Sequence, residues 1–120
     1  MQYTLLIYGD ETAQDSVPPE QADAVMAEWG AYDRWLTEKG FKRAGEALQP
    51  TGQATTVRGT ATVDGPFAET KEQLGGFYLI ECDDLDQALE AAKQCPGAKY
   101  GAIEVRPVID LSETGMAAPS

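Results

Sequence analysis

The chain has 120 residues, of which 42% are hydrophobic and 24% are charged, and these values favour one globular domain and argue against wholesale disorder. Nine Lys and Arg residues against 20 Asp and Glu residues give a net charge of −11, which repels phosphate backbones and argues against nucleic-acid binding. The sequence contains no histidine, so the commonest general base and metal ligand is missing, together with every Ser-His-Asp or Cys-His arrangement.

The first half of the chain predicts a strand, a long helix and a second strand. Tyr3–Tyr8 is a short apolar run typical of a strand, and residues 9–14 are polar and indicate a loop. A helix is expected to open at Ser16 and Pro18-Pro19 and to end at Lys39-Gly40, where a cation and a glycine are favourable. Its apolar stripe consists of Ala22, Val25, Met26, Trp29, Tyr32 and Leu36.

The second half predicts four further strands and one helix. The second strand of the first half is residues 44–48. The four further strands are residues 54–57 and 60–63, which form a hairpin around Arg58-Gly59, then residues 77–82 and 102–106. Asp84 and Gln87 have the spacing of a capping box before a helix, which ends at Cys95-Pro96-Gly97. The buried stripe of this helix is expected to be Leu85, Ala88, Leu89 and Ala92. Residues 1–108 then form one domain, and residues 109–120 form a C-terminal tail that is expected to fray.

This order of elements predicts an α+β fold with a ferredoxin-like β-α-β-(hairpin)-β-α-β sheet and the helices on one face. The first strand is expected to lie at the centre of the sheet, beside Phe77–Cys82 and parallel to it, because both strands are apolar on both faces. In the last strand Ile103 and Val105 alternate with Glu104 and Arg106, which is typical of an edge.

Two helices can cover only one face of such a sheet. The other face would carry an apolar set, either Leu6, Tyr8, Tyr78 and Ile80 or the alternate register. Because monomers seldom expose a large contiguous apolar patch, we expect a homodimer joined through its sheet faces. The alternative is that the hairpin and the tail fold over this face.

The ends and the cysteines indicate a cellular location. The first apolar run stops at Gly9-Asp10, too early for a signal peptide or a membrane span, so we expect a cytoplasmic protein with no membrane partner. Cys82 and Cys95 cannot form a zinc site unaided, and free thiols are favoured over a disulfide. No metal site is expected, because the sequence has no Asp-x-Asp-x-Asp-Gly loop and helix capping explains Asp83-Asp84. No cofactor is expected, since Gly75-Gly76 precedes a strand and indicates a bend or bulge rather than a phosphate loop.

One long block resembles a known family. The stretch from Asp64 to Tyr78 reads DGPFAETKEQLGGFY and is similar to the signature of DGPF-domain proteins, a branch of the YCII-related superfamily. The blocks GEALQP at residues 45–50 and YGAIEVRP at residues 100–107 resemble flanking parts of the same family. The resemblance covers residues 3–108 and implies a dimeric α+β barrel built on a ferredoxin-like fold, with little implied about activity.

The chain departs from part of that family in its chemistry. Some YCII-type relatives are thought to use a His-Asp pair for acid-base work, and a lyase-like dehydrochlorinase belongs to the wider group. This chain has no histidine, and the Asp-Pro that such relatives carry after the second helix is Cys95-Pro96 here. That mechanism therefore does not transfer.

Three residues are candidates for catalysis. Asp64 and Glu46 are candidate bases, and Tyr78 is a candidate acid. Each has a simpler interpretation as well: Asp64-Gly65-Pro66 is turn chemistry, Glu46 suits a solvated sheet edge, and Tyr78 suits a core. The candidates for ligand binding are Arg58, Phe67, Lys71 and Trp29, with a solvated loop or core packing as the alternative for each.

The sequence thus leads to two functional hypotheses. In the first, a cytoplasmic homodimer binds a small molecule in a carboxylate-lined pocket, with lyase- or isomerase-type proton transfer if it is an enzyme. In the second, the protein is a non-catalytic dimeric partner or regulator that uses its acidic surface to contact a basic protein. The resemblance supports such a partner, because the genes of that family often lie near those for alternative sigma factors.

Overall fold

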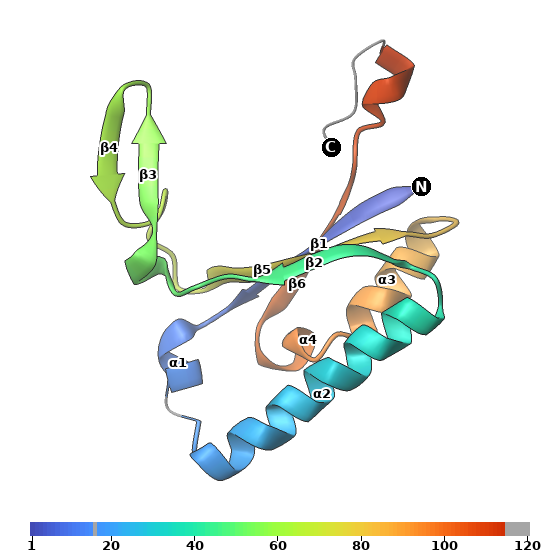
Figure 1. Ribbon diagram of the computed structural model, residues 1–120, viewed down its shortest axis with the longest axis horizontal. Helices are drawn as coiled ribbons and strands as arrows, with labels where there is room; N and C mark the ends of the chain where they lie inside the picture. Colours follow the sequence, from blue (N-terminus) through green and yellow to red (C-terminus); the bar gives the residue numbers. More distant parts are fainter. Residues whose placement is uncertain (16, 115–120) are drawn as a thin grey trace.

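The protein is a four-stranded antiparallel sheet with helices on one side and a separate two-stranded hairpin on the other (Figure 1). The computed structural model describes residues 1–15 and 17–114. The main sheet contains β1 (Gln2–Gly9), β2 (Lys42–Ala47), β5 (Gln73–Glu81) and β6 (Ala102–Pro107), and the hairpin contains β3 (Thr55–Arg58) and β4 (Ala61–Asp64). The helices are α1 (Glu11–Asp15), α2 (Pro19–Glu38), α3 (Leu85–Gln94) and α4 (Gly97–Tyr100), with short 3-10 turns at Thr51–Gln53 and Leu111–Thr114.

The strand order is β2-β5-β1-β6, which confirms that β1 and β5 are central neighbours and that β6 is an edge. The expectation that β1 and β5 are parallel was wrong, since β1 pairs with β5, and with β6, in antiparallel fashion. The reason is the inserted hairpin. The crossover through α2 makes β2 parallel to β1, and the chain then reverses through the hairpin before it enters β5 between them.

The core lies between the sheet and the helices. Tyr3 and Leu5 of β1 and Ile80 of β5 are buried there against Tyr32 and Leu36 of α2. Ile7, Tyr78, Ile103 and Val105 pack at its margin. These positions alternate along their strands, as the period of two requires, so one face of the sheet supplies the whole core.

The stripe predicted for α2 is buried only in its second half. Tyr32 and Leu36 are buried, but Met26 is 70% exposed, because α2 diverges from the sheet toward its N-terminus (Figure 1). The helix ends as expected at Lys39-Gly40, where Gly40 has a positive φ of 74°. Ser16, which the sequence placed at the helix start, lies outside the described residues.

The α3 helix begins as predicted but buries a different stripe. The Asp84 carboxylate accepts a hydrogen bond from the backbone amide of Gln87. The Gln87 side chain in turn accepts one from the backbone amide of Asp83, the residue before the N-cap. These reciprocal bonds confirm the predicted capping box. The buried residues are Ala88, Ala91 and Ala92, whereas Leu85 and Leu89 are exposed. Small side chains let α3 approach the sheet closely, and the larger leucines lie on its flank.

Several boundaries differ from the sequence prediction. Residues 11–15 form the short helix α1, since the Asp10 carboxylate accepts hydrogen bonds from Thr12, and residues 97–100 form α4 after the predicted helix end. Strand β5 begins at Gln73. Ile7 pairs with Gly76 and Tyr8 pairs with Leu74, so Gly75 has no partner on β1 and forms a bulge, as Gly75-Gly76 had indicated. Gly59 has φ of 63° at the predicted hairpin tip and Gly65 has φ of 109° at the predicted turn. Of the tail, residues 111–114 form a 3-10 turn, and residues 115–120 lie outside the described range.

The second face of the sheet is free of helices (Figure 1). We call it the open face and define it by its side chains Thr4, Leu6, Tyr8, Ala44, Glu46, Phe77, Leu79, Glu104 and Arg106, which follow from the strand registers. Tyr78 and Ile80 face the helices, so the first of the two predicted alternatives, Leu6 and Tyr8 with Tyr78 and Ile80, is excluded. Leu6 and Tyr8 share the open face with Phe77 and Leu79 instead. The hairpin and the C-terminal segment up to residue 114 stand on this side of the sheet and project away from its strands (Figure 1).

Both cysteines are free and buried, in agreement with the preference for thiols. Among the described residues, no helix combines the length and apolar character needed to cross a membrane.

Gly45 sets how closely β2 can pack beside Tyr78. A Cβ atom at residue 45 would lie 2.6 Å from Cδ1 and 2.8 Å from Cε1 of the Tyr78 ring. We therefore expect Gly45→Ala to lower the free energy of unfolding by about 1–3 kcal/mol in urea titrations, because the ring must move. Gly52→Ala, whose Cβ would meet nothing within 4 Å, is the control and should change stability by less than about 0.5 kcal/mol. Equal effects of the two substitutions would contradict this account.

Candidate functional site

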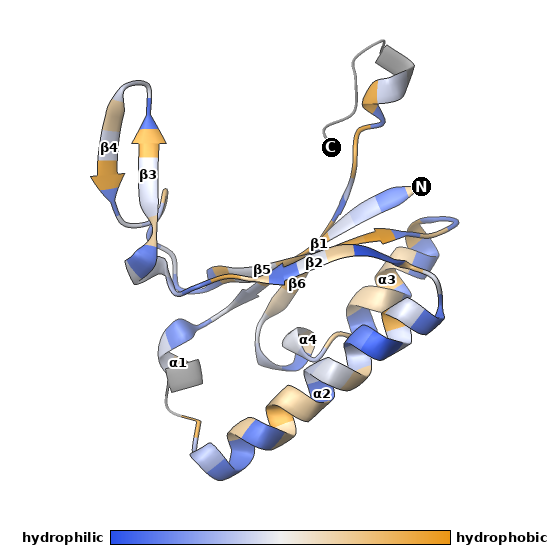
Figure 2. Ribbon diagram, viewed as in Figure 1, coloured by the Kyte–Doolittle hydropathy of each residue, from blue (hydrophilic) through white to orange (hydrophobic). Residues whose placement is uncertain are grey.

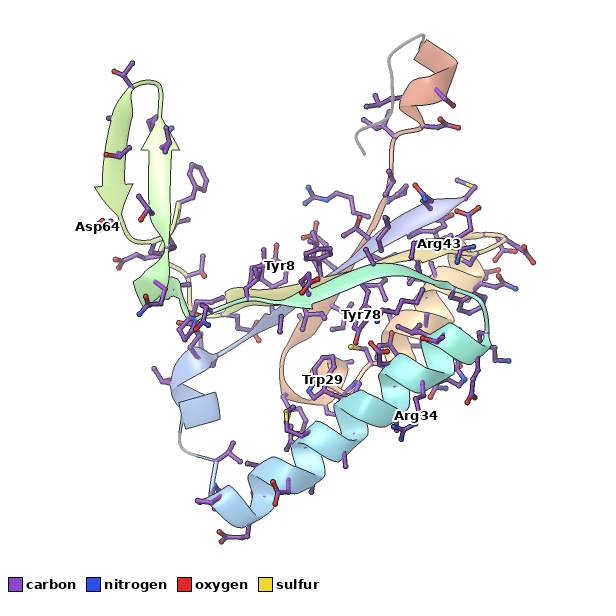
Figure 3. The ribbon with its side chains drawn as sticks, in the orientation of Figure 1. Tyr8, Trp29, Arg34, Arg43, Asp64 and Tyr78 are labelled. Atoms are coloured by element: carbon purple, nitrogen blue, oxygen red, sulfur yellow. The ribbon has the colours of Figure 1, made fainter. Side chains whose placement is uncertain are left out.

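The three candidate catalytic residues occupy three different places. Tyr78 pairs with Gly45 and Glu46 pairs with Phe77, so Tyr78 faces the helices and Glu46 lies on the open face. Asp64 ends the hairpin strand β4 opposite Thr55 and is exposed. Figure 3 shows Tyr78 between the sheet and α2, and Asp64 on the hairpin that stands off the sheet. One copy of the chain therefore does not bring Asp64, Glu46 and Tyr78 together.

Tyr78 belongs to a polar cluster with Asp33 of α2 and Lys42 of β2. The Tyr78 hydroxyl donates to Asp33 Oδ2 over 3.3 Å, and Lys42 Nζ donates to the same oxygen over 2.8 Å. Lys42 Nζ also lies 5.9 Å from the centre of the Tyr78 ring. The cluster connects the end of the long helix to the edge strand of the sheet.

The electrostatics of this cluster keep Tyr78 protonated. Burial, then the negative charge of Asp33 and the hydrogen bond to it, raise the pKa of Tyr78 to about 12. A phenol with this pKa holds its proton at neutral pH, so it can donate a hydrogen bond but is poorly matched to general acid catalysis. The arrangement is well suited to fixing α2 against β2.

The candidate ligand-binding residues are also dispersed. The Arg58 guanidinium lies 5.2 Å from the centre of the Phe67 ring, so these two hairpin residues do meet. Lys71 lies in the exposed loop before β5, where its charge helps to lower the pKa of Asp10 after the larger effect of hydrogen bonds from Thr12. Trp29 packs edge-on against Tyr32 and lies against Gly97, as a residue at the margin of the core.

Asp64 begins the turn that follows β4, but its carboxylate takes no part in the hydrogen bonds of that turn. Gly65 takes the positive φ that the turn requires, and its amide donates to the carbonyl of Ala54. Within the described part of the chain, no hydrogen bond or ion pair involves the Asp64 carboxylate. It is a solvated carboxylate on a projecting hairpin, and a role as base remains a prediction.

The open face carries a polar group that sequence reasoning did not select. The Tyr8 hydroxyl donates to Glu104 Oε1 over 3.3 Å, and Arg106 donates to Glu104 Oε2 from Nε over 3.2 Å. Hydrogen bonds from Arg106 lower the pKa of Glu104. Figure 3 shows Tyr8 on the side of the sheet opposite Tyr78. The alternation of residues 102–107 was the available signal, since inward Ile103 and Val105 force Glu104 and Arg106 onto the face of Tyr8.

Glu46 is on the same face, on the edge strand β2. Its neighbours Gly45 and Ala47 are small, and among the described residues no hydrogen bond or ion pair involves its carboxylate. An accessible acidic oxygen beside small residues can accept hydrogen bonds from a ligand. The open face thus holds an engaged carboxylate, Glu104, and a free one, Glu46.

The helix side has two shallow grooves. One, of about 330 Å³, lies between α2 and the α3–α4 junction and is crossed by the ion pair of Lys99 Nζ and Glu28 Oε2 at 2.8 Å. The other, of about 230 Å³, lies between α3 and the edge strand β6. No group of three or more Cys, Asp or Glu side chains in the described ranges could hold a metal ion.

The proton on Tyr78 gives a measurable pH dependence. Because its pKa is raised, the protonated phenol stabilises the fold below the ordinary value of 10.0, and this contribution is lost as the pH rises toward 12. Asp33→Asn removes the negative charge and should lower the Tyr78 pKa, measured from the ring carbon shift in NMR titrations. Glu38→Gln, on the same helix, is the control and should leave it unchanged. An unaltered Tyr78 pKa in Asp33→Asn would contradict the role given to Asp33.

Comparison with known proteins identifies the family of the chain. Residues 1–112 match the YCII-related domain. The uncharacterized protein R00369 of Rhizobium meliloti (strain 1021) is 42% identical over 114 residues, covering 90% of this chain and 92% of that protein. A family match over almost the whole chain, with a relative of this identity, shows that the chain belongs to the YCII-related domain family.

Proposed function

We propose that two copies of the chain pair through their open faces and enclose a small-molecule pocket lined by carboxylates. The order β2-β5-β1-β6 with helices on one face supports a ferredoxin-like plan, and membership of the YCII-related family supports a dimeric α+β barrel. The two free thiols favour a reducing, cytoplasmic location for this dimer.

The single observation that carries the proposal is the uncovered apolar centre of the sheet. Leu6, Phe77 and Leu79 lie side by side on the open face, where each is half-buried by its neighbours and no helix of the described residues lies over them (Figure 1). Figure 2 shows hydrophobic residues also on the hairpin and the C-terminal segment that stand on this side. Apolar surface of this kind is stabilised when a second protein surface removes it from water.

The distribution of charge favours this face over the helix side. α2 carries five acidic residues against one Arg, so two helix layers repel one another. β1 has no charged residue, Glu104 on the open face is neutralised by Arg106, and the free carboxylate of Glu46 lies away from the centre on the edge strand β2. Two copies of net charge −11 therefore meet at the lowest electrostatic cost through their sheets.

The polar residues of the open face define the pocket at the dimer seam. Glu46 supplies a free carboxylate, and Tyr8 and Glu104 supply a hydroxyl and a second acidic group. Such a pocket selects a small molecule that carries hydrogen-bond donors or a positive charge. In a proton transfer at this pocket, Glu46 would be the base.

A second candidate is a non-catalytic dimeric partner or regulator. The dispersion of Asp64, Glu46 and Tyr78 over the hairpin, the open face and the helix side favours this candidate, because a catalytic site needs its groups around one substrate. An Asp64→Asn variant that folds normally and keeps both binding and turnover would remove Asp64 as a base.

The oligomeric state tests the proposed pairing. We expect a dimer at micromolar concentration in sedimentation velocity or light scattering. Leu6→Lys buries an unpaired charge at the proposed seam and should raise the dimer dissociation constant by roughly a hundredfold or more. Leu85→Lys, at an exposed leucine of α3, is the matched control and should remain dimeric. A wild-type protein that is monomeric at these concentrations would contradict the proposal.

Ligand capture tests the pocket. The purified dimer is exposed to a metabolite mixture, and bound small molecules are identified by native mass spectrometry. Glu46→Gln should reduce capture about tenfold or more, because a hydrogen bond to a charged acceptor is lost. Glu38→Gln, an acidic residue of α2 outside the pocket, should capture as the wild type does. Equal capture by both variants would exclude Glu46 from the site.

A further inference from the structure

The hairpin β3–β4 is an arm that its own copy does not support. It stands away from the sheet and the helices (Figure 1). In the described part of the chain, its strands pack chiefly against each other. The radius of gyration of 16.1 Å is larger than the value of about 13.6 Å expected for 120 compact residues, as projecting segments require.

The base of this arm is nevertheless firmly built. The Glu11 carboxylate accepts hydrogen bonds from the Thr51 amide and the Thr51 hydroxyl, both over 2.8 Å. The Glu11 amide in turn donates to the Gln73 side chain over 3.0 Å, at the start of β5. These bonds tie α1 and β5 to the segment that enters the hairpin, so its direction is set before any partner binds.

Large apolar side chains on the arm are exposed to solvent. Val57 is 65% exposed, Val63 is 61% exposed and Phe67 is 75% exposed. An isolated two-stranded hairpin is marginally stable in water, and stability comes from packing one of its faces on another surface. The arm therefore has both the direction and the surface of a docking element.

The strand register divides these residues between two faces of different character. Val57 pairs with Thr62 and Thr55 pairs with Asp64, so these four share one face, the Asp64 face. Val63 pairs with Thr56 and Arg58 pairs with Ala61, which form the other face, the Arg58 face. Phe67 joins the Arg58 face through its contact with the Arg58 guanidinium. One face thus carries a cation with an aromatic ring, and the other carries an acid.

We propose that the Arg58 face of the hairpin docks on the second copy of the chain, beyond the edge of the paired sheets. This inference rests on the dimer proposed above and deepens it. A second copy has a net charge of −11, which attracts Arg58 and repels Asp64, so charge complementarity selects the Arg58 face. The hairpin also stands on the same side of the sheet as the open face, so a copy seated on that face meets the arm (Figure 1).

The docked arm adds side chains to the pocket at the dimer interface that the open face of a single copy does not provide. The open face offers the carboxylates of Glu46 and Glu104, and the hairpin of the second copy adds Arg58 and Phe67 at the rim. Arg58 and Phe67 then contribute to binding only in the dimer. This explains why these two residues meet on an arm that reaches away from their own sheet.

Two valines provide a matched test. Val57 and Val63 have nearly equal exposure, and each pairs across the hairpin with a threonine, but they lie on opposite faces. Val63→Asp should raise the dimer dissociation constant at least tenfold in sedimentation equilibrium, whereas Val57→Asp should change it less than threefold. Phe67→Ser should follow Val63→Asp. Amide hydrogen exchange of residues 55–64 should also slow on dimerisation in the wild type and not in Val63→Asp.

The outcomes separate this proposal from the one on which it rests. A dimer that dissociates with Leu6→Lys but responds equally to Val57→Asp and Val63→Asp keeps the sheet pairing and overturns the docked arm. A wild-type protein that stays monomeric at every concentration overturns both. A loss of hairpin folding would affect both valine variants alike, so only a selective effect of Val63→Asp supports docking.

Discussion

The placement of both crossover helices on one side of the sheet controls the rest of the molecule. β5 runs opposite to β1, and β6 lies on the other side of β1 from β2. The crossover from β5 to β6 thus starts from a strand of opposite direction and moves across the sheet in the opposite sense to the crossover from β1 to β2. Two crossovers of the same hand therefore bring α2 and α3 to the same face. One face then has a complete core, and no helix of the described residues packs on the other. The open face follows from this asymmetry.

A one-sided core must be packed closely because it is thin. α3 contributes alanines, and Gly97 lies so close to the sheet that a Cβ there would be 3.0 Å from Ile7 Cγ2 and 3.2 Å from Ile103 Cδ1. Gly45 plays the same part beside the Tyr78 ring. Among the described residues, the side chains of Leu5, Leu36, Ile80 and Cys95 are less than 2% exposed. Such a core holds one layer of helices and leaves nothing to support the hairpin.

Local chemistry made much of this fold predictable from the sequence. The capping residues Asp84 and Gln87, the stop at Gly40 and the glycines of the two turns act within a few residues, and each was correctly identified. The direction of β5 relative to β1 depends on the whole chain between them, so local patterns could not determine it. The exposure of Met26 likewise depends on how far α2 diverges from the sheet, which its periodicity does not encode.

The candidate site was less predictable, since it depends on which face each strand presents. Glu46 and Tyr78 were grouped by residue type, yet the register places Gly45, and not Glu46, opposite Tyr78. Tyr8 was counted as apolar surface, although its hydroxyl donates a hydrogen bond to Glu104 of β6. A shift of one residue in a strand exchanges the two faces, so composition alone cannot assign polar side chains to a common pocket.

The sheet also separates two chemical environments that the sequence presents as one. Tyr78, Asp33 and Lys42 satisfy one another beneath it, and burial with the Asp33 charge raises the pKa of Tyr78 to about 12. Tyr8, Glu46, Glu104 and Arg106 lie above it, and Glu46 alone among these has an unengaged charge in the described structure. Side chains that leave a sheet in opposite directions cannot share a small substrate. A small molecule bound to the sheet therefore meets the groups of one face only, and on the open face Glu46 is the carboxylate that no described residue engages.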